Sequence, residues 1–428
     1  MSDSAASEVV APPPIKRIKL SETDSEEDRL SDLPESIILH TLSFLNTKRA
    51  VQTSVLSKRW KDLWKRVPAL TLHSADFGAY KKFTRLVSKV LSLRDTSISL
   101  HSLDFKRSHG RLEPNIKKIV NYALSHNVRR LGLNFNDFPT LKTFTEFVSN
   151  VLSHRDSSIS LQTLDFKRTH GGLVPQIIEN IVDYALSNNV QQLGLCFNGN
   201  IEETLPSMFS SQTLTHLNLS IYPSQAWFPK SFNLPALTNL RLENFIFYIG
   251  DDGRAEPFSI FNKLNNLTIC SCAMEFVFTG APIPILPGSN VSSLKHVDIH
   301  AGVKQYHEKS PLLLSRWLLV FANIKSLTIS ATTLQVLSLI PNLSEICPPS
   351  LRNLKSLKVK MEELTPGFRV KLLNAKSRNA ESKNERKRLR KKFKEEISGS
   401  LIPNGIVNFL LQNSPSAEVE FIDCKATS

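Results

Sequence analysis

The side chains of this 428-residue chain that could carry chemistry are few, and their spacing fits no catalytic or metal site. Cys270-Ser271-Cys272 places two thiols one residue apart, whereas zinc sites use a wider spacing and a second pair of ligands. Two histidines, in His109-Gly110 and His170-Gly171, recur because the sequence around them recurs, and a turn after a strand accounts for both. The carboxylates of Asp104 and Asp165 recur in the same way, at positions where a solvated strand residue is expected.

The sequence also lacks the common motifs that hold phosphates, metals or activated nucleophiles. It contains no GxGxxG or GxxxxGK loop, no HExxH pair and no GxSxG elbow. No neighbouring charge marks a cysteine as a ubiquitin-transferring nucleophile. The five cysteines are too few and too scattered for a disulfide framework, which favours reduced intracellular thiols at Cys196, Cys270, Cys272, Cys347 and Cys424. We therefore expect a protein that is not an enzyme and that uses no cofactor or metal.

The most informative element is the segment 28–64, where large apolar side chains recur at helical intervals of three and four residues. Asp32 is a candidate N-cap for a first helix, and Glu35 follows it as in a capping box. That helix should end near Leu45-Asn46, and two further short helices are expected between 48 and 64.

A unit of about forty residues rarely buries so many large apolar groups by itself. We expect part of them to face another protein; the alternative is an ordinary amphipathic helix pair buried against the following domain. The residues concerned are Leu33, Pro34, Ile37, Ile38, Leu42, Leu45, Val55, Leu56, Trp60 and Trp64.

The spacing of these ten residues, the opening DRLSDLP and the ending VLSKRWKDLW resemble a plant-type F-box. The resemblance implies that this module docks the Skp-family adaptor of a cullin-based ubiquitin ligase, and that the ten residues include the adaptor contacts. Sequence cannot sort which of them face the adaptor and which face the rest of the chain.

A second pattern, apolar–x–x–apolar–x–apolar, recurs eleven times at intervals of 23 to 33 residues and resembles leucine-rich repeats. The last two apolar residues of each copy are two apart, so they share one side of a strand, and stacked strands can bury that side together. The first residues of the copies are Val67, Leu100, Val128, Leu161, Val190, Leu214, Leu237, Leu264, Leu294, Ile324 and Leu354.

Two consecutive repeats are duplicated in tandem, because the sequence of 83–136 returns at 144–198 with an offset of 61 and then 62 residues. Each copy is predicted to read helix, strand, helix, strand, with the helices at 83–93 and 114–125 in the first copy and at 144–154 and 175–187 in the second. The duplication should lengthen the solenoid by two units without breaking its register, because each unit contacts only its neighbours.

The C-terminal region 362–428 resembles the small FBD region that ends many plant F-box/leucine-rich-repeat proteins, with a helix predicted at 405–412 and a strand at 418–422. The predicted fold class is thus an α/β solenoid, an irregular leucine-rich-repeat arc over 69–361. It follows a small all-α F-box at 28–68 and ends in a small α+β FBD-like region.

Charge concentrates in one place. Residues 371–394 hold eleven Lys/Arg and two Glu, so this stretch carries +9 of the net charge of +14. The basic insertion 375–397 could be an exposed helix or disordered, and a disordered tail is predicted for 1–27. Basic residues in both places are candidate nuclear import signals or merely solvated charges, namely Lys16, Arg17, Lys19, Lys387, Arg388, Arg390, Lys391 and Lys392.

The leading functional hypothesis is a substrate receptor in the nucleus or cytoplasm, which reaches a cullin scaffold through the adaptor and holds an unknown protein substrate. The alternatives are a nuclear nucleic-acid-associated protein, disfavoured because few aromatic residues accompany the basic run, and an F-box scaffold that ubiquitinates nothing. No run approaches the roughly 18 apolar residues of a membrane span, so no membrane partner is expected. The substrate surface should be formed by strand residues that alternate with the buried ones: Asp104, Lys106, Arg130, Asn134, Asp165, Lys167, His216, Asn218, Arg241, Glu243, Asp298, His300 and Lys358.

Overall fold

The structure is a computed structural model. It describes residues 32–107, 114–126, 128–135, 144–146, 148–149, 160–199, 210–222, 226–228, 233–249, 258, 261–270, 273–276, 293–300, 314–315, 318–319, 321, 323–340, 351–377, 382–399 and 401–423. The candidate import residues Lys16, Arg17 and Lys19 and the predicted tail 1–27 lie outside these residues.

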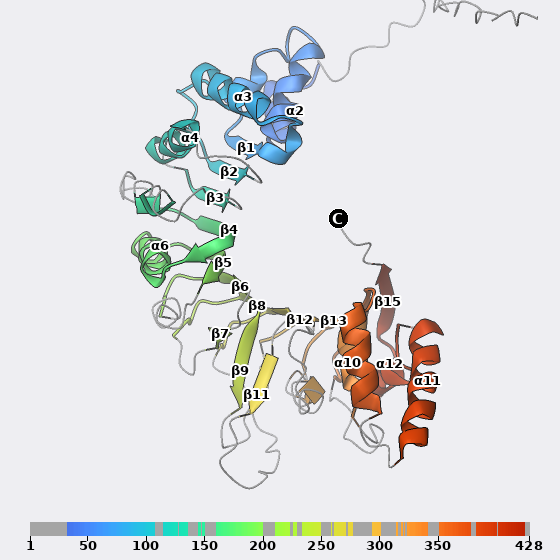
Figure 1. Cartoon of the computed structure of the whole chain (residues 1–428). Coiled ribbons are helices and arrows are strands. Elements are labelled where there is room, and N and C mark those ends of the chain that lie inside the picture. The colour runs from blue at the N-terminus through green and yellow to red at the C-terminus, as the bar shows by residue number, and fades with distance from the viewer. Residues whose placement is uncertain are drawn as a thin grey trace, which may run out of the picture.

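A parallel sheet of twelve strands runs through the described part of the chain, and its strands line the inner side of an arc (Figure 1). Its strands, in spatial order, are β1 (Ala69–His73), β2 (Ser102–Arg107), β3 (Arg130–Phe135), β4 (Thr163–Leu173), β5 (Gln192–Gly199), β6 (His216–Tyr222), β8 (Asn239–Glu243), β10 (Asn266–Cys270), β12 (His296–His300), β13 (Ser326–Ser330), β14 (Ser356–Met361) and β15 (Glu418–Asp423). A second sheet joins β11 (Ala273–Phe276), β9 (Phe245–Ile249) and β7 (Ala226–Trp227).

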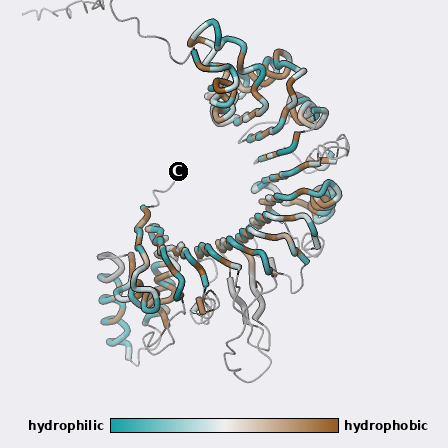
Figure 2. The backbone as a smooth tube through the Cα atoms, turned by 180° about the vertical axis from the view of Figure 1, so that it is seen from behind, coloured by the Kyte–Doolittle hydropathy of each residue, from teal (hydrophilic) through white to brown (hydrophobic). Residues whose placement is uncertain are grey.

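The repeat pattern read from the sequence accounts for this sheet. Each of the eleven apolar triplets supplies one strand from β1 to β14, and all of their side chains are buried. Equivalent residues pair in register; Leu70 faces Leu103, for example, which in turn faces Leu131. Figure 2 shows the resulting alternation of apolar and polar residues along the strands. The predicted solenoid-like architecture is therefore confirmed, and the structure adds that its strands run parallel.

Helices cover the outer side of the arc, where α4 and α6 can be followed in Figure 1. The helices that accompany the repeats are α3 (Tyr80–Leu93), α4 (Pro114–Ser125), α6 (Pro175–Ser187) and α9 (Ala331–Leu337). The bounds of α4 and α6 coincide with the two helices predicted from the duplication, and of the fourth predicted helix residues 144–146 and 148–149 are described and helical.

The N-terminal module folds into α1 (Glu35–Ser43), α2 (Thr47–Gln52) and 3₁₀ turns at Thr53–Val55 and Leu63–Arg66. The predicted N-cap was wrong: α1 begins after Pro34, whose backbone is still extended, and no side chain caps the helix. Asn46, read as a stop signal, caps α2 instead, because its Oδ1 accepts a hydrogen bond of 2.8 Å from the Arg49 N–H.

The C-terminal region contains α10 (Pro366–Lys376), α11 (Lys383–Gly399) and α12 (Ile406–Leu411), followed by β15. Most of the basic insertion is therefore helical, which was one of the two predicted outcomes. The Lys376 ammonium lies 5.0 Å from the centre of the Phe393 ring, and this contact packs α11 against α10. The domain boundaries at 68 and 361 stay a prediction, although β15 of the last region continues the sheet of the repeats.

Among the described residues, no helix has the length and the apolar content that crossing a membrane requires.

Candidate partner-binding surfaces

Nine of the ten apolar residues predicted to contact an adaptor fall into two groups, and Leu33 lies between them in exposure. Ile38 and Leu42 of α1, together with Trp60 and Trp64, are buried in the same core as the first repeats. These four side chains belong to a core that is continuous with that of the solenoid, and they offer no surface to another protein. Leu33 is partly buried and packs against this core.

The other group is exposed and forms the apolar surface of the N-terminal module. Val55 and Leu56 are 87% and 60% exposed, and Phe44, directly after α1, is 76% exposed. Sequence reasoning missed Phe44, although it follows Ile37 by seven residues and therefore lies on the same face of the helix. We call this set the exposed F-box surface; its members are Pro34, Ile37, Phe44, Leu45, Val55 and Leu56.

Polar contacts hold the exposed F-box surface in place. An Arg59 Nη donates a hydrogen bond of 2.6 Å to the Leu33 carbonyl, and Arg66 forms an ion pair with Glu35, so both ends of the module are tied together. The Thr71 N–H of β1 donates to Thr47 Oγ1 of α2 over 2.9 Å. The last contact fixes α2 on the outer edge of the first strand, and the module is thus rigidly positioned on the arc.

The second candidate surface is the concave face of the sheet. None of the thirteen polar residues predicted to line it is buried. Several are paired across strands: His73 Nε2 lies 2.9 Å from an Asp104 carboxylate oxygen, and the ammonium of Lys360 reaches the Asp298 carboxylate over 2.7 Å. The face is therefore a network of opposite charges, without a basic or acidic excess that would select one class of partner.

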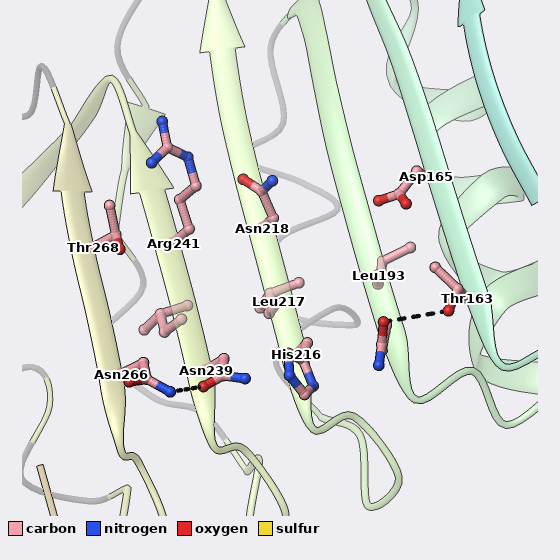
Figure 3. A pocket seen from close by; sticks show the side chains of 12 residues that line it. Thr163, Asp165, Leu193, His216, Leu217, Asn218, Asn239, Arg241, Asn266 and Thr268 are labelled. Atoms are coloured by element: carbon pink, nitrogen blue, oxygen red, sulfur yellow. Dashed lines mark hydrogen bonds between the residues drawn. The ribbon is translucent and has the colours of Figure 1, made fainter. Parts of the chain in front are cut away.

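A depression of about 220 Å³ lies on this face between β4 and β10 (Figure 3). Its base consists of the buried leucines Leu193, Leu217 and Leu240. Its rim is polar, formed by Thr163, Asp165, Gln192, His216, Asn218, Asn239, Arg241, Asn266 and Thr268. Such a lining offers hydrogen bonds to a peptide at its rim and apolar contact at its base.

One glycine, Gly194, makes room for the Asp165 carboxylate at the edge of this depression. Asp165 lies between Gly132 and Gly194 in register, and a Cβ on Gly194 would stand only 2.0 Å from its Oδ1. Although the Asp165 side chain is exposed, partial desolvation by the neighbouring strands raises the pKa of its carboxyl, and the nearby charge of Asp104 adds to the rise. A carboxylate with a raised pKa takes up a proton more readily than a free carboxylate does. It also accepts a hydrogen bond from a partner more readily.

The described cysteines on the concave face are poor nucleophiles. Burial raises the pKa of both the Cys196 and the Cys270 thiol, so the reactive thiolate is disfavoured. Among the described residues, no cluster of three or more histidine, cysteine or carboxylate side chains could hold a metal ion.

The candidate import residues that the structure describes all lie on α11. All five are exposed: Lys387, Arg388, Arg390, Lys391 and Lys392. Arg390 also binds the end of α10, because its guanidinium donates hydrogen bonds to Ser377 and Asn374. The basic residues are thus presented on a helix rather than on an extended segment.

Comparison with known proteins identifies the N-terminal module and its relatives. The family model of the F-box domain matches residues 30–71. A putative FBD-associated F-box protein of Arabidopsis thaliana is 45% identical over 28% of this chain and 27% of the relative. F-box/LRR-repeat protein 25 of the same plant is 33% identical over 28% of the chain and 45% of the relative, and a putative F-box/FBD/LRR-repeat protein is 34% identical over 36% and 39%.

The matched segments span less than half the length of each of these relatives. The F-box match begins two residues after the predicted start at 28 and ends three residues after the predicted end at 68. The resemblance predicted from the sequence is confirmed: the chain carries an F-box domain and is similar to plant F-box/leucine-rich-repeat proteins, among them FBD-associated ones.

Proposed function

We propose that this chain is the substrate-recognition subunit of an SCF-type cullin ubiquitin ligase. The exposed F-box surface would bind a Skp-family adaptor, and through it a cullin scaffold, while the concave face of the repeats would hold a protein substrate. The observation that carries the proposal is the F-box domain at 30–71, on which large apolar side chains stay exposed although the tryptophans of the same module are buried.

The proposed role requires no reacting group on this chain. Holding a substrate beside a charged ubiquitin-conjugating enzyme raises the effective concentration of the substrate's lysines, and proximity alone then accelerates transfer. The division of the F-box residues supports this reading: of the ten predicted residues four are buried and one is partly buried, and the other five, together with Phe44, remain exposed for the adaptor. The F-box relatives, which are named as F-box and repeat proteins, are consistent with an adaptor role of this kind.

The concave depression is the proposed contact for the substrate, because its polar rim follows five neighbouring strands and could bind an extended peptide across them. We also propose that α12 and β15 belong to an FBD region, as the names of the relatives suggest.

Adaptor binding tests the proposal directly. The full chain and a variant carrying Phe44→Ala and Val55→Ala would be titrated with a purified plant Skp-family adaptor by calorimetry. Each of these side chains contributes roughly 1.5–3 kcal/mol when fully buried, so the double variant should bind at least about 30-fold more weakly. The matched control is Val370→Ala on α10, where the valine is 57% exposed but far from the F-box in sequence.

Two outcomes would contradict the proposal. The first is undetectable binding of the wild-type chain to any tested Skp-family adaptor. The second is equal affinity of the wild type and the double variant. If the adaptor binds but the assembled complex ubiquitinates no co-purified protein, the chain is an F-box scaffold and not a substrate receptor.

A further inference from the structure

The two edge strands of the twelve-stranded sheet, β1 and β15, differ in whether their outer edges are covered. At the N-terminal end, α2 covers the outer edge of β1, and Thr47 Oγ1 accepts the hydrogen bond of the outward-pointing Thr71 N–H. At the C-terminal end, β15 pairs with β14 alone, and no strand among the described residues lies on its other side. A sheet edge of this kind presents unpaired backbone donors and acceptors.

The hydrogen-bonding direction of β15 identifies the groups on its open edge. The Glu418 N–H donates to the Lys355 carbonyl over 2.9 Å, toward β14. Because successive residues of a strand alternate in direction, the N–H and C=O groups of Val419 and Phe421 point away from β14. These two residues are therefore the ones that could pair with an added strand.

The apolar core also remains open at this end. Val419 and Phe421 are 37% and 56% exposed, although their register partners Leu357 and Val359 are completely buried. In every other strand of the solenoid these two positions are sealed by the next unit. An added strand with apolar side chains at the same two positions would continue the core by one unit.

The charge of β15 indicates which strand would fit. Glu418 and Glu420 stand on its concave face, and Glu420 already pairs with the Lys358 ammonium of β14 over 2.8 Å. On its paired edge β15 therefore binds β14, whose sequence SLKVKM alternates lysine with branched apolar residues. A partner strand on the open edge would lie beside the same two carboxylates, Glu418 and Glu420, which we call the acidic row.

A second copy of this chain fits the edge poorly. Pairing β15 with another β15 would bring acidic side chains together across the strands, which is destabilising. Pairing β15 with β1 of a second copy is blocked, because α2 occupies the outer edge of β1.

We propose that β15 is a docking strand that binds one extended segment of a partner protein, in which lysine or arginine alternates with branched apolar residues. Main-chain hydrogen bonds to Val419 and Phe421 provide the pairing, and the acidic row selects the basic partner. This site is separate from the exposed F-box surface and does not depend on the adaptor role.

The test uses the full chain and a fluorescein-labelled peptide that contains SLKVKM between Gly-Ser flanks, followed by fluorescence anisotropy. Val419→Pro removes the edge N–H but leaves the bonds to β14, since proline is tolerated where the N–H faces solvent. We expect saturable binding to the wild type and a loss of about tenfold or more in the variant. Val419→Ala is the matched control and should lose less, because it retains the N–H.

A second variant keeps the proposal testable if the proline variant is poorly folded. Phe421→Ser leaves every backbone group in place and should weaken binding by about tenfold, because an aromatic side chain no longer packs against the added strand. A charge-swapped peptide containing SLEVEM should bind at least about tenfold more weakly than SLKVKM.

Three results would overturn the proposal. One is the absence of saturable binding by the SLKVKM peptide, which would mean that the acidic residues only protect the edge from pairing. Another is equal affinity for the two peptides or for the wild type and both edge variants. The third is a dimeric wild type that becomes monomeric on Val419→Pro, because a second copy would then occupy the edge.

Discussion

The division of the F-box residues into a buried and an exposed group can be tested by the same substitution, leucine to alanine, at Leu42 and at Leu56. Leu42 lies on the inner face of α1 and is completely buried, whereas Leu56 is 60% exposed on the same module. We predict that Leu42→Ala destabilises the module and that Leu56→Ala weakens adaptor binding without destabilising it.

The expected magnitudes follow from burial. Replacing a fully buried leucine by alanine lowers the free energy of unfolding by about 2–5 kcal/mol, because it combines lost apolar contact with a cavity. Replacing Leu56 should change stability by less than about 0.5 kcal/mol. If the exposed three-fifths of Leu56 becomes buried against the adaptor, its loss costs about 1–2 kcal/mol, which corresponds to roughly 5- to 30-fold in the dissociation constant.

Hydrogen exchange measured by mass spectrometry separates the two effects, because it reports the local stability of each segment of the chain. Peptides from α1 should exchange about 100-fold faster in Leu42→Ala, for a loss of roughly 3 kcal/mol, and at the wild-type rate in Leu56→Ala. Calorimetry with the adaptor supplies the second readout. Equal exchange rates in the two variants, or a Leu56→Ala variant as unstable as Leu42→Ala, would refute the division of the surface.

Three further predictions concern the rest of the chain. Deleting 144–205 should leave a folded, shorter protein with unchanged strand signal per residue by circular dichroism, and an unfolded product would contradict the modular reading of the duplication. Asp165→Asn should raise the melting temperature at neutral pH. Because the folded pKa lies above the ordinary 3.8, stability falls as pH rises through this window, and the gain should vanish below pH 3.8. Replacing the basic residues of α11 by glutamine should move a nuclear pool of tagged protein into the cytoplasm, and an unchanged distribution would exclude an import role for Lys387, Arg388, Arg390, Lys391 and Lys392.

The repeats could be predicted strand by strand because each unit repeats the same local condition. A triplet such as Leu237, Leu240 and Leu242 fixes which residues face the core, and parallel stacking then aligns every copy with the next. The duplicated helices were predictable for the same reason, since Pro175 begins α6 where Pro114 begins α4.

Other features depend on contacts that no local pattern contains. The sequence pattern does not distinguish Ile37 from Ile38, and only the packing of α1 on the 3₁₀ turn Leu63–Arg66 of the same module buries one and exposes the other. Pro34 takes the place of the predicted cap Asp32, because its extended backbone starts the helix two residues later. The raised pKa of Asp165 arises from desolvation and from the charge of Asp104, and the close approach of Gly194 to its carboxylate could not be read from the sequence.

The F-box and the repeats share one core, and this has a consequence for how the proposed complex would work. Trp60 and Trp64 are buried together with Val67 and Leu70 of the first repeat, so the module cannot rotate without opening the start of the solenoid. Substrate position relative to the adaptor is then set by the number of repeats between them. The tandem duplication inserts two units between the F-box and the later strands, and it therefore shifts any substrate bound beyond β5 along the arc. A chain lacking one copy should bind the adaptor equally well but present such a substrate at a different place, which separates adaptor affinity from the efficiency of ubiquitin transfer.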